Sequence, residues 1–150
     1  MLKAITLSSV LLFSIQNLFA QLNPVKWSYT SEKVSHQEYD LIITANVDPG
    51  WYIYSQYLES DDGPIRTSFN FSENEAFKLM GQTKENGKKK EGFDDLFGMN
   101  VIKYSGTTQF VQRIKLSAPL QEVSGYLEFM TCDDDQCLPP KEIDFAIKLQ

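Results

Sequence analysis

Two cysteines in a short acidic segment carry the most reactive chemistry of this chain. Cys132 and Cys137 are the only cysteines among the 150 residues, and the four residues between them include three aspartates. This spacing lets the two cysteines face each other across the base of a hairpin loop, where opposed Cα atoms lie about 4.5–5.5 Å apart and a disulfide can form. Pro139 and Pro140 follow, so we expect an extended, stiff chain after Cys137.

The residues alone leave a structural staple and a redox-active pair both open. Closing a loop of about six residues restricts the unfolded chain by only ~2 kcal/mol, against nearly 5 for a hundred-residue loop. A small ring in a polar loop is therefore better suited to being opened and closed by a partner. The neighbouring aspartates disfavour a thiolate, so the reduced pair should react slowly with stray disulfides and depend on a partner for reaction.

A metal site is the third chemistry that these residue types permit. Two thiols and three carboxylates lack a nearby imidazole, because the single histidine, His36, lies in a distant polar segment. The acidic run also lacks the glycine and the terminal glutamate of a calcium loop. We expect no metal and no other cofactor, and we expect His36 to be a solvent-exposed loop residue.

The first twenty residues have the pattern of a secretory signal peptide. Lys3 supplies a positive charge, residues 4–19 are largely apolar, and Ala20 precedes a plausible cleavage point. The prediction is a signal peptide at residues 1–20, a mature domain at residues 21–150, and a periplasmic or secreted location, where disulfides persist. No later stretch is apolar enough to span a bilayer, so we expect no membrane span in the mature chain.

The length and composition of the chain limit the number of domains and the classes of partner that it can bind. A chain of 150 residues that is 42% hydrophobic is long enough for one domain with a proper core. The net charge of −6 argues against a nucleic-acid partner, because phosphate binding requires clustered lysines and arginines. One dense basic stretch, residues 84–90, also contains Glu85, Asn86 and Gly87, which predicts a solvated turn.

Alternation of apolar and polar residues dominates the chain after residue 24 and predicts half-buried strands. The apolar positions with this spacing are Val25, Trp27 and Tyr29; Tyr39, Leu41, Ile43, Ala45 and Val47; Phe69 and Phe71; Phe77 and Leu79; Phe110, Ile114 and Leu116; Leu127, Phe129 and Thr131; and Ile143, Phe145, Ile147 and Leu149. Turn signals occur at residues 48–50, 61–64, 86–87, 105–106 and 124–125. Seven to nine strands at this spacing predict an all-β, antiparallel β-sandwich of immunoglobulin-like type, with a closed barrel as the weaker alternative.

Three segments resemble the N-terminal periplasmic domain of DsbD, a membrane thiol–disulfide reductase. Residues 128–142, Glu-Phe-Met-Thr-Cys-Asp-Asp-Asp-Gln-Cys-Leu-Pro-Pro-Lys-Glu, resemble the cysteine motif of this family. Residues 48–54, Asp-Pro-Gly-Trp-Tyr-Ile-Tyr, are similar to its Gly-aromatic-Tyr-x-Tyr strand. Residues 94–98, Asp-Asp-Leu-Phe-Gly, are similar to its cap loop. With the strand pattern between them, the resemblance covers residues 24–150.

The resemblance implies a thiol:disulfide oxidoreductase with an immunoglobulin-like fold. A thioredoxin-like protein or a membrane thiol–disulfide reductase would supply electrons, and oxidised periplasmic proteins would accept them. Cys137 would attack the target disulfide, and Cys132 would resolve the mixed disulfide. The residues that would surround the pair are Asp94, Asp95, Leu96, Phe97 and Gly98 in the cap loop, with Leu96 and Phe97 as its apolar lid and Gly92 and Gly98 as possible hinges, and Tyr52, Tyr54, Asp133 and Pro139 along the site.

The chain departs from full-length DsbD at its C-terminal side. It ends at Gln150, with neither the membrane electron conduit nor the C-terminal thioredoxin-like domain. We therefore expect either a stand-alone version fed by separate proteins or a relative that has lost its electron supply. The alternative function is a non-enzymatic binding or assembly module with a structural disulfide. For residues 51, 52 and 54 an ordinary buried strand remains open, and for Phe93, Leu96 and Phe97 ordinary core packing or a partner surface.

Overall fold

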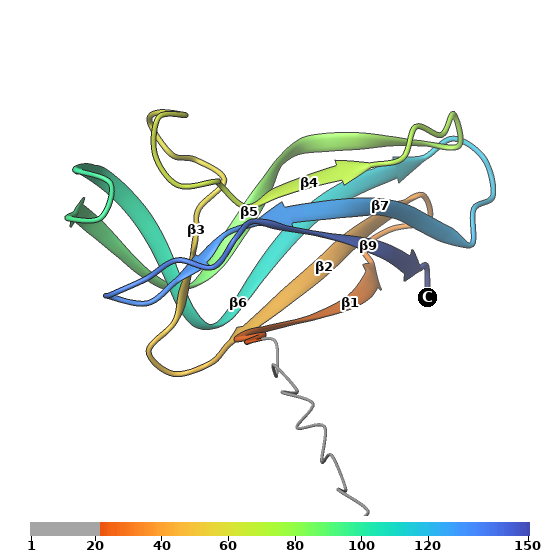
Figure 1. The fold of residues 1–150 in the computed structure, drawn as a ribbon. Coiled ribbons are helices and arrows are strands. Elements are labelled where there is room, and N and C mark those ends of the chain that lie inside the picture. Colours follow the sequence, from red (N-terminus) through yellow and green to blue (C-terminus); the bar gives the residue numbers. More distant parts are fainter. Residues whose placement is uncertain (1–21) are drawn as a thin grey trace, which may run out of the picture.

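The computed structural model describes residues 22–150, which form two antiparallel β-sheets packed face to face (Figure 1). The predicted signal peptide, residues 1–20, lies outside the described residues. The first sheet contains β1 (Val25–Lys33), β2 (Glu38–Val47), β3 (Tyr52–Tyr54), β5 (Phe77–Asp94), β6 (Met99–Leu116) and β8 (Thr131–Cys132). The second contains β4 (Ser68–Phe71), β7 (Glu122–Phe129) and β9 (Lys141–Lys148). This arrangement confirms the predicted all-β, immunoglobulin-like sandwich.

The core between the sheets follows the predicted alternation. Leu41, Ile43 and Phe110 from the first sheet are fully buried, and Leu127 and Ile147 from the second sheet are at most 1% exposed. The register places Ile43 directly opposite Phe110, so alternate residues of β2 and β6 form one apolar face. Burial of this face is the main force that holds the two sheets together.

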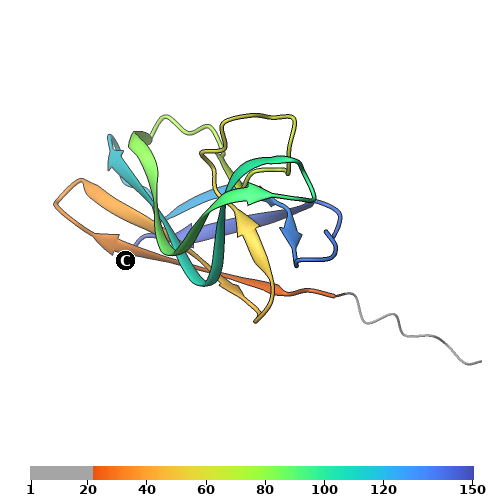
Figure 2. The same cartoon turned by 90° about the vertical axis from the view of Figure 1, so that its left-hand side faces the viewer.

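Strand β6 organises the first sheet because it has two different neighbours along one edge. Its C-terminal half pairs with β2, and residues 103–104 pair with β3 instead. Gly106, with φ of 65°, lies where one pairing gives way to the other. Such a positive φ favours glycine and bends the strand. Strand β5 pairs with β6 along its other edge, so these two strands form a long hairpin whose tip lies at one end of the sandwich (Figures 1 and 2).

Three of the predicted turns are wrong, because the residues concerned lie inside strands. Residues 86–87 and the basic stretch around them belong to β5, residues 105–106 to β6 and residues 124–125 to β7. Glycine in a strand often marks a bulge or a close backbone approach, and sequence alone does not separate these from turns. The structure shows a register shift between Asn86 and Lys88, and the backbone of Asn70 comes close to Gly125.

Leu79 also departs from the predicted pattern. Phe77 is buried as expected, but 47% of Leu79 is exposed. A second register shift, between Met80 and Lys84, interrupts the pairing of β5 with β6 just beyond Leu79. Strand β5 is an edge strand here, so its outer residues have no further strand to pack against.

Candidate functional site

The two cysteines form a disulfide at the end of the first sheet. Cys132 and Cys137 are bonded, with their Cα atoms 4.0 Å apart, and they face each other as an isolated antiparallel bridge. Backbone hydrogen bonds close the loop on both sides: Asp133 N–H donates to Gln136 O at 2.9 Å, and Leu138 N–H donates to Thr131 O at 2.9 Å. The prediction that the two cysteines face each other across a hairpin loop is confirmed, although their Cα atoms are closer than the expected separation of about 4.5–5.5 Å.

The two sulfur-bearing residues differ in exposure. Cys132 belongs to β8 and is fully buried, whereas Cys137 lies in the loop before β9 and is half-buried. The loop after it is open, since Pro139 is exposed. Solvent therefore reaches the ring from the Cys137 side.

The carboxylates of the ring interact with the backbone of their own loop or with solvent. The Asp133 carboxylate accepts hydrogen bonds from the N–H groups of Asp135, at 2.9 Å, and Gln136, at 2.8 Å. These backbone hydrogen bonds hold the pKa of Asp133 below its ordinary value, so its charge persists beside the cysteines. Asp134 and Asp135 are exposed.

Strand register explains why the cysteine pair meets aromatic side chains. Tyr52 lies opposite Cys132, and Tyr54 lies opposite Lys103 of β6. Since side chains alternate between the faces of a sheet, these residues share one face, while Ile53 points to the opposite face and joins the main core. The result is a second, smaller apolar cluster of Tyr52, Tyr54, Leu58, Val101 and Cys132, with Phe97, Met99, Ile102, Met130 and Cys137 packed against it.

Two hydrogen bonds join Tyr52 to the segment that carries the cysteines. Its hydroxyl donates to Asp133 O at 2.7 Å, and its backbone oxygen accepts the hydroxyl of Thr131 at 3.0 Å. Tyr52 also packs edge-on against Tyr54, with ring centroids 5.7 Å apart. This pair of tyrosines forms the floor of the site.

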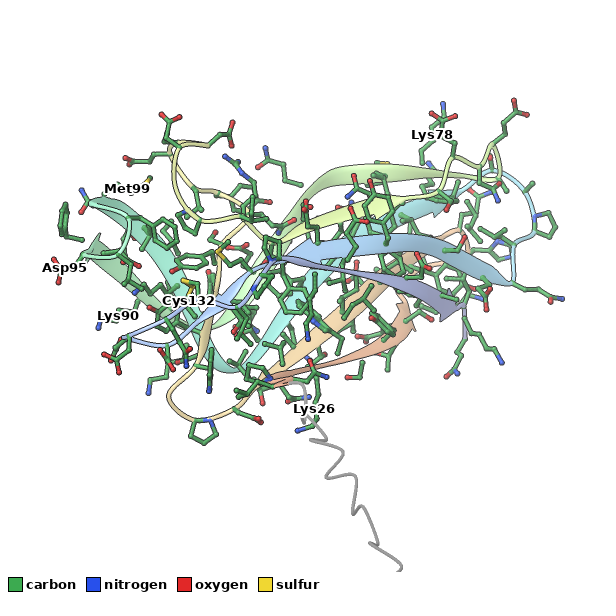
Figure 3. The ribbon with its side chains drawn as sticks, in the orientation of Figure 1. Lys26, Lys78, Lys90, Asp95, Met99 and Cys132 are labelled. Atoms are coloured by element: carbon green, nitrogen blue, oxygen red, sulfur yellow. A yellow bond between two sulfur atoms is a disulfide. The ribbon has the colours of Figure 1, made fainter. Side chains whose placement is uncertain are left out.

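The cap loop, residues 94–98, is the tip of the β5–β6 hairpin and covers this floor. The ring of Phe97 packs edge-on against Tyr54, with centroids 5.9 Å apart, and it belongs to the cluster around Cys132. Leu96 is different, because 45% of it is exposed. Phe97 and Met99 are thus the apolar residues that pack over the floor. Figure 3 shows Met99, Asp95 and Cys132 at the same end of the molecule, opposite the end that carries Lys78.

The predicted hinge glycines have different backbone conformations. Gly98 ends the turn with φ of 64°, a left-handed conformation that residues with a side chain rarely adopt. Gly92 instead lies within β5, where it pairs with Val101. The loop is therefore short, and Asp94 and Met99 pair at its base.

Asp94 is the polar centre of the cap, and its neighbour Asp95 is exposed. Only 2% of the Asp94 side chain is accessible. One carboxylate oxygen accepts the N–H of Leu96 at 2.8 Å, and the other accepts the Tyr54 hydroxyl at 3.3 Å and lies 2.9 Å from the ammonium of Lys103. Burial opposes ionisation of Asp94, but the Lys103 ammonium and the Leu96 N–H outweigh it and hold its pKa below the ordinary value.

The pKa values of Lys103 and Tyr54 are both raised, as this arrangement requires. Burial favours a neutral Lys103, but its contacts with Tyr52 and Asp94 outweigh that effect and raise its pKa. Burial, together with the charge of Asp94, raises the pKa of Tyr54, which therefore keeps its proton as a donor. At neutral pH the Asp94 carboxylate and the Lys103 ammonium are therefore both charged, and Tyr54 keeps its proton.

Sequence reasoning missed several residues of the site. Lys103, Val101, Leu58, Met99 and Met130 all contribute, and Thr131 was noted only as a strand residue. No local signal marks Lys103, because its role depends on the register between β3 and β6. Among residues 22–150 no group of three or more potential metal ligands occurs, and none of these residues forms a helix that is long and apolar enough to cross a membrane.

Comparison with known proteins gives a consistent family relationship. The family model for the N-terminal part of the thiol:disulfide interchange protein DsbD matches residues 20–149. The structure of the Neisseria meningitidis DsbD N-terminal domain in its reduced form aligns with a TM-score of 0.52 and 17% identity, over 81% of this chain and 84% of that one. No curated protein matches the chain in a direct sequence comparison.

A second solved structure supports the same fold. The N-terminal periplasmic domain of ScsB from Proteus mirabilis aligns with a TM-score of 0.56 and 15% identity. The alignment covers 83% of this chain and 45% of that chain. Both likenesses lie at low sequence identity, so they describe the shared sandwich fold rather than a shared partner.

Proposed function

Because the chain belongs to the DsbD N-terminal domain family, we propose that its Cys132–Cys137 pair exchanges thiols and disulfides with protein partners outside the cytoplasm. The observation that carries this proposal is the asymmetry of the pair. Cys132 is fully buried in the cluster against which Phe97 of the cap loop packs, whereas Cys137 is half-buried at the other end of a six-residue ring. A purely structural staple has no need of a partly exposed cysteine.

The exchange proceeds through a mixed disulfide. The Cys137 thiolate attacks one sulfur of an oxidised target, so a Cys137–target bond forms while the target disulfide breaks. The Cys132 thiolate then attacks the Cys137 sulfur, which releases the reduced target and restores the Cys132–Cys137 disulfide. Two electrons have passed to the target, and a thioredoxin-like protein or a membrane thiol–disulfide reductase returns two electrons to the pair.

The surroundings of the cysteine pair limit its reaction with small molecules. Phe97 of the cap loop packs against Tyr54 and the cluster that contains Cys132, and Tyr52 and Tyr54 form the floor of the site. The persistent charge of Asp133 disfavours a thiolate in its neighbourhood. Both features slow reaction with small oxidants and reserve the pair for partners that move the cap. We propose a periplasmic location on the same family grounds, with residues 1–20 as the export signal.

Trapping of the mixed disulfide tests this function. In a Cys132→Ala variant the resolving thiol is gone. The partner is a thioredoxin-like protein that keeps only its attacking cysteine, supplied as a mixed disulfide with a small aromatic thiol. The Cys137 thiolate should displace the aromatic thiol and stay bonded to the partner as a covalent complex on a non-reducing gel. The matched variant Cys137→Ala keeps only the buried sulfur and should trap at least about tenfold less. Absence of any complex with Cys132→Ala, or equal trapping by both variants, would favour the alternative of a binding module with a structural disulfide.

A further inference from the structure

Lys103 is the cation of the site, and it lies between the tyrosine floor and the cap loop. Its ammonium is 2.9 Å from the Asp94 carboxylate and 3.9 Å from the centroid of the Tyr52 ring. Only 16% of its side chain is exposed. A lysine in this position is held by an ion pair on one side and by the face of an aromatic ring on the other.

Asp94 transmits this contact to the cap loop. Its carboxylate accepts the N–H of Leu96, and its backbone oxygen accepts the N–H of Gly98 at 2.8 Å. Both acceptors belong to one residue, so the position of Asp94 determines the position of the whole turn, including Phe97. Whatever fixes Asp94 therefore also fixes the apolar cover of the cysteine pair.

We propose that Lys103 is a positioning residue that holds the cap loop closed over the Cys132–Cys137 pair by pairing with Asp94. This inference rests on the proposed function, since it concerns the access of reagents to the same pair. The contacts that hold Lys103 are with Asp94 and the Tyr52 ring rather than with either sulfur. It acts on the pair through Asp94 and the loop.

Removal of the ammonium explains how the cap would open. Without Lys103, a carboxylate that is only 2% exposed would retain just the Tyr54 hydroxyl and the Leu96 N–H as partners. A buried charge without its counter-ion is costly, and the least costly response is to hydrate it. Because Asp94 is the first residue of the cap loop, its movement toward water also moves Phe97 away from Tyr54.

The test measures how fast a small reagent reaches the disulfide. Oxidised protein is mixed with dithiothreitol at neutral pH, quenched with acid, and tagged with a maleimide that reports free thiols. Dithiothreitol becomes a cyclic disulfide while Cys132 and Cys137 become thiols. Lys103→Met keeps the apolar stem against Tyr52 but removes the charge, and it should react about tenfold faster, as expected for the loss of one charge-assisted hydrogen bond. Lys103→Arg keeps the positive charge beside Asp94 and should react clearly more slowly than Lys103→Met.

Lys89→Met is the matched control. It removes a lysine from the same hairpin, one that pairs with Glu91 at 2.9 Å on the exposed surface, and it should leave the rate unchanged. Asp94→Asn breaks the same ion pair from the other side and should also accelerate reduction. The double variant Lys103→Met with Asp94→Asn should react no faster than the faster single variant, because both changes remove one interaction.

Two results would overturn the inference. One is a Lys103→Met protein that is folded, as judged by its thermal unfolding, and reacts at the wild-type rate. The other is a Lys103→Arg protein that reacts as fast as Lys103→Met. If Lys103→Met does not fold, Asp94→Asn decides the question by the same criterion. Failure of the proposed function would show separately, as absence of trapping by Cys132→Ala, in which Lys103 is unchanged.

Discussion

Tyr52 lies directly opposite Cys132 in the β3–β8 pair, and its hydroxyl reaches past that residue to donate a 2.7 Å hydrogen bond to Asp133 O. The same tyrosine accepts the Thr131 hydroxyl through its backbone oxygen. Tyr52 is therefore fastened to the cysteine segment on both sides of Cys132. This places the disulfide against a rigid strand rather than in a free loop.

Replacement of Tyr52 by Phe should weaken this attachment without changing the packing of the ring. We expect the free energy of unfolding of the oxidised protein to fall by about 1 kcal/mol, because one partly buried hydrogen bond is lost and Asp133 O loses its donor. Urea denaturation measures the change. Tyr126→Phe, on the exposed side of β7, is the control and should stay within about 0.5 kcal/mol of wild type. Equal effects in the two variants would contradict a specific role for the Tyr52 hydroxyl.

Phe97→Ala should open the cover of the pair. The variant loses the edge-on contact with Tyr54, so we expect a stability loss of about 1–2 kcal/mol and a roughly tenfold faster reduction by dithiothreitol. Phe93 provides a matched control on the same hairpin, because 65% of it is exposed. Phe93→Ala should leave both quantities near their wild-type values. A Phe97→Ala protein with an unchanged reduction rate would show that Phe97 does not shield the disulfide.

Gly98→Ala should strain the cap loop. Gly98 has φ of 64°, and a side chain in this region costs about 1–2 kcal/mol. We expect lower stability and faster reduction of the disulfide, both measured as for Phe97. Gly92→Ala is the control, because this glycine lies in β5 with open space where a Cβ atom would be placed. The expectation would be wrong if Gly92→Ala destabilised the protein as much as Gly98→Ala.

The strand pattern of the sequence predicted the sandwich because burial of one face of each strand produces an alternation of apolar and polar residues along the sequence. The alternation from Tyr39 to Val47 corresponds to β2, with Leu41, Ile43 and Ala45 fully buried. Turn signals were less reliable, since Gly106 and Gly125 serve inside strands. A glycine that bends a strand and a glycine that reverses the chain have the same local sequence.

The candidate site was predictable only in part, for a physical reason. The cysteine pair was predicted from its own motif, and residues 94–98 were singled out by the family resemblance. Lys103 was not, because its importance arises from strand register, which places it opposite Tyr54 and within reach of Asp94. Met99 joins the cover of the site for a similar reason, since it pairs with Asp94 at the base of the loop. Such relationships are set by tertiary structure rather than by local sequence.

The Asp94–Lys103 pair also predicts a pH dependence of stability. The folded-state pKa of Asp94 is below its ordinary value. Its contribution to stability is therefore fully present at pH values above the ordinary pKa and is lost as the pH falls through the folded-state pKa. The folded-state pKa of Lys103 is above its ordinary value. Its contribution to stability is therefore fully present below the ordinary lysine pKa and is lost as the pH rises through the folded-state pKa. Between about pH 5 and pH 9 the effect of the pair should be constant.

Asp94→Asn tests this pH dependence by urea denaturation. The variant should be less stable than wild type by about 2 kcal/mol at neutral pH, and the difference should shrink below about pH 4. Asp40, whose pKa is also lowered by its hydrogen bond with Arg113, should keep its own contribution to acid sensitivity in the variant. Asp95→Asn, at an exposed position of the cap loop, is the control and should stay within about 0.5 kcal/mol of wild type at neutral pH. A stability difference that grew on acidification would contradict the ion pair.

The redox equilibrium with thioredoxin tests the central claim most directly. Oxidised protein is incubated with mixtures of reduced and oxidised thioredoxin, and the fraction of Cys132 and Cys137 thiols is counted by maleimide tagging and mass. An exchanging pair should equilibrate, with a midpoint potential close to or above that of thioredoxin at about −270 mV. A pair that stays oxidised in excess reduced thioredoxin, with a potential below about −300 mV, would be a structural disulfide and would contradict the proposed function.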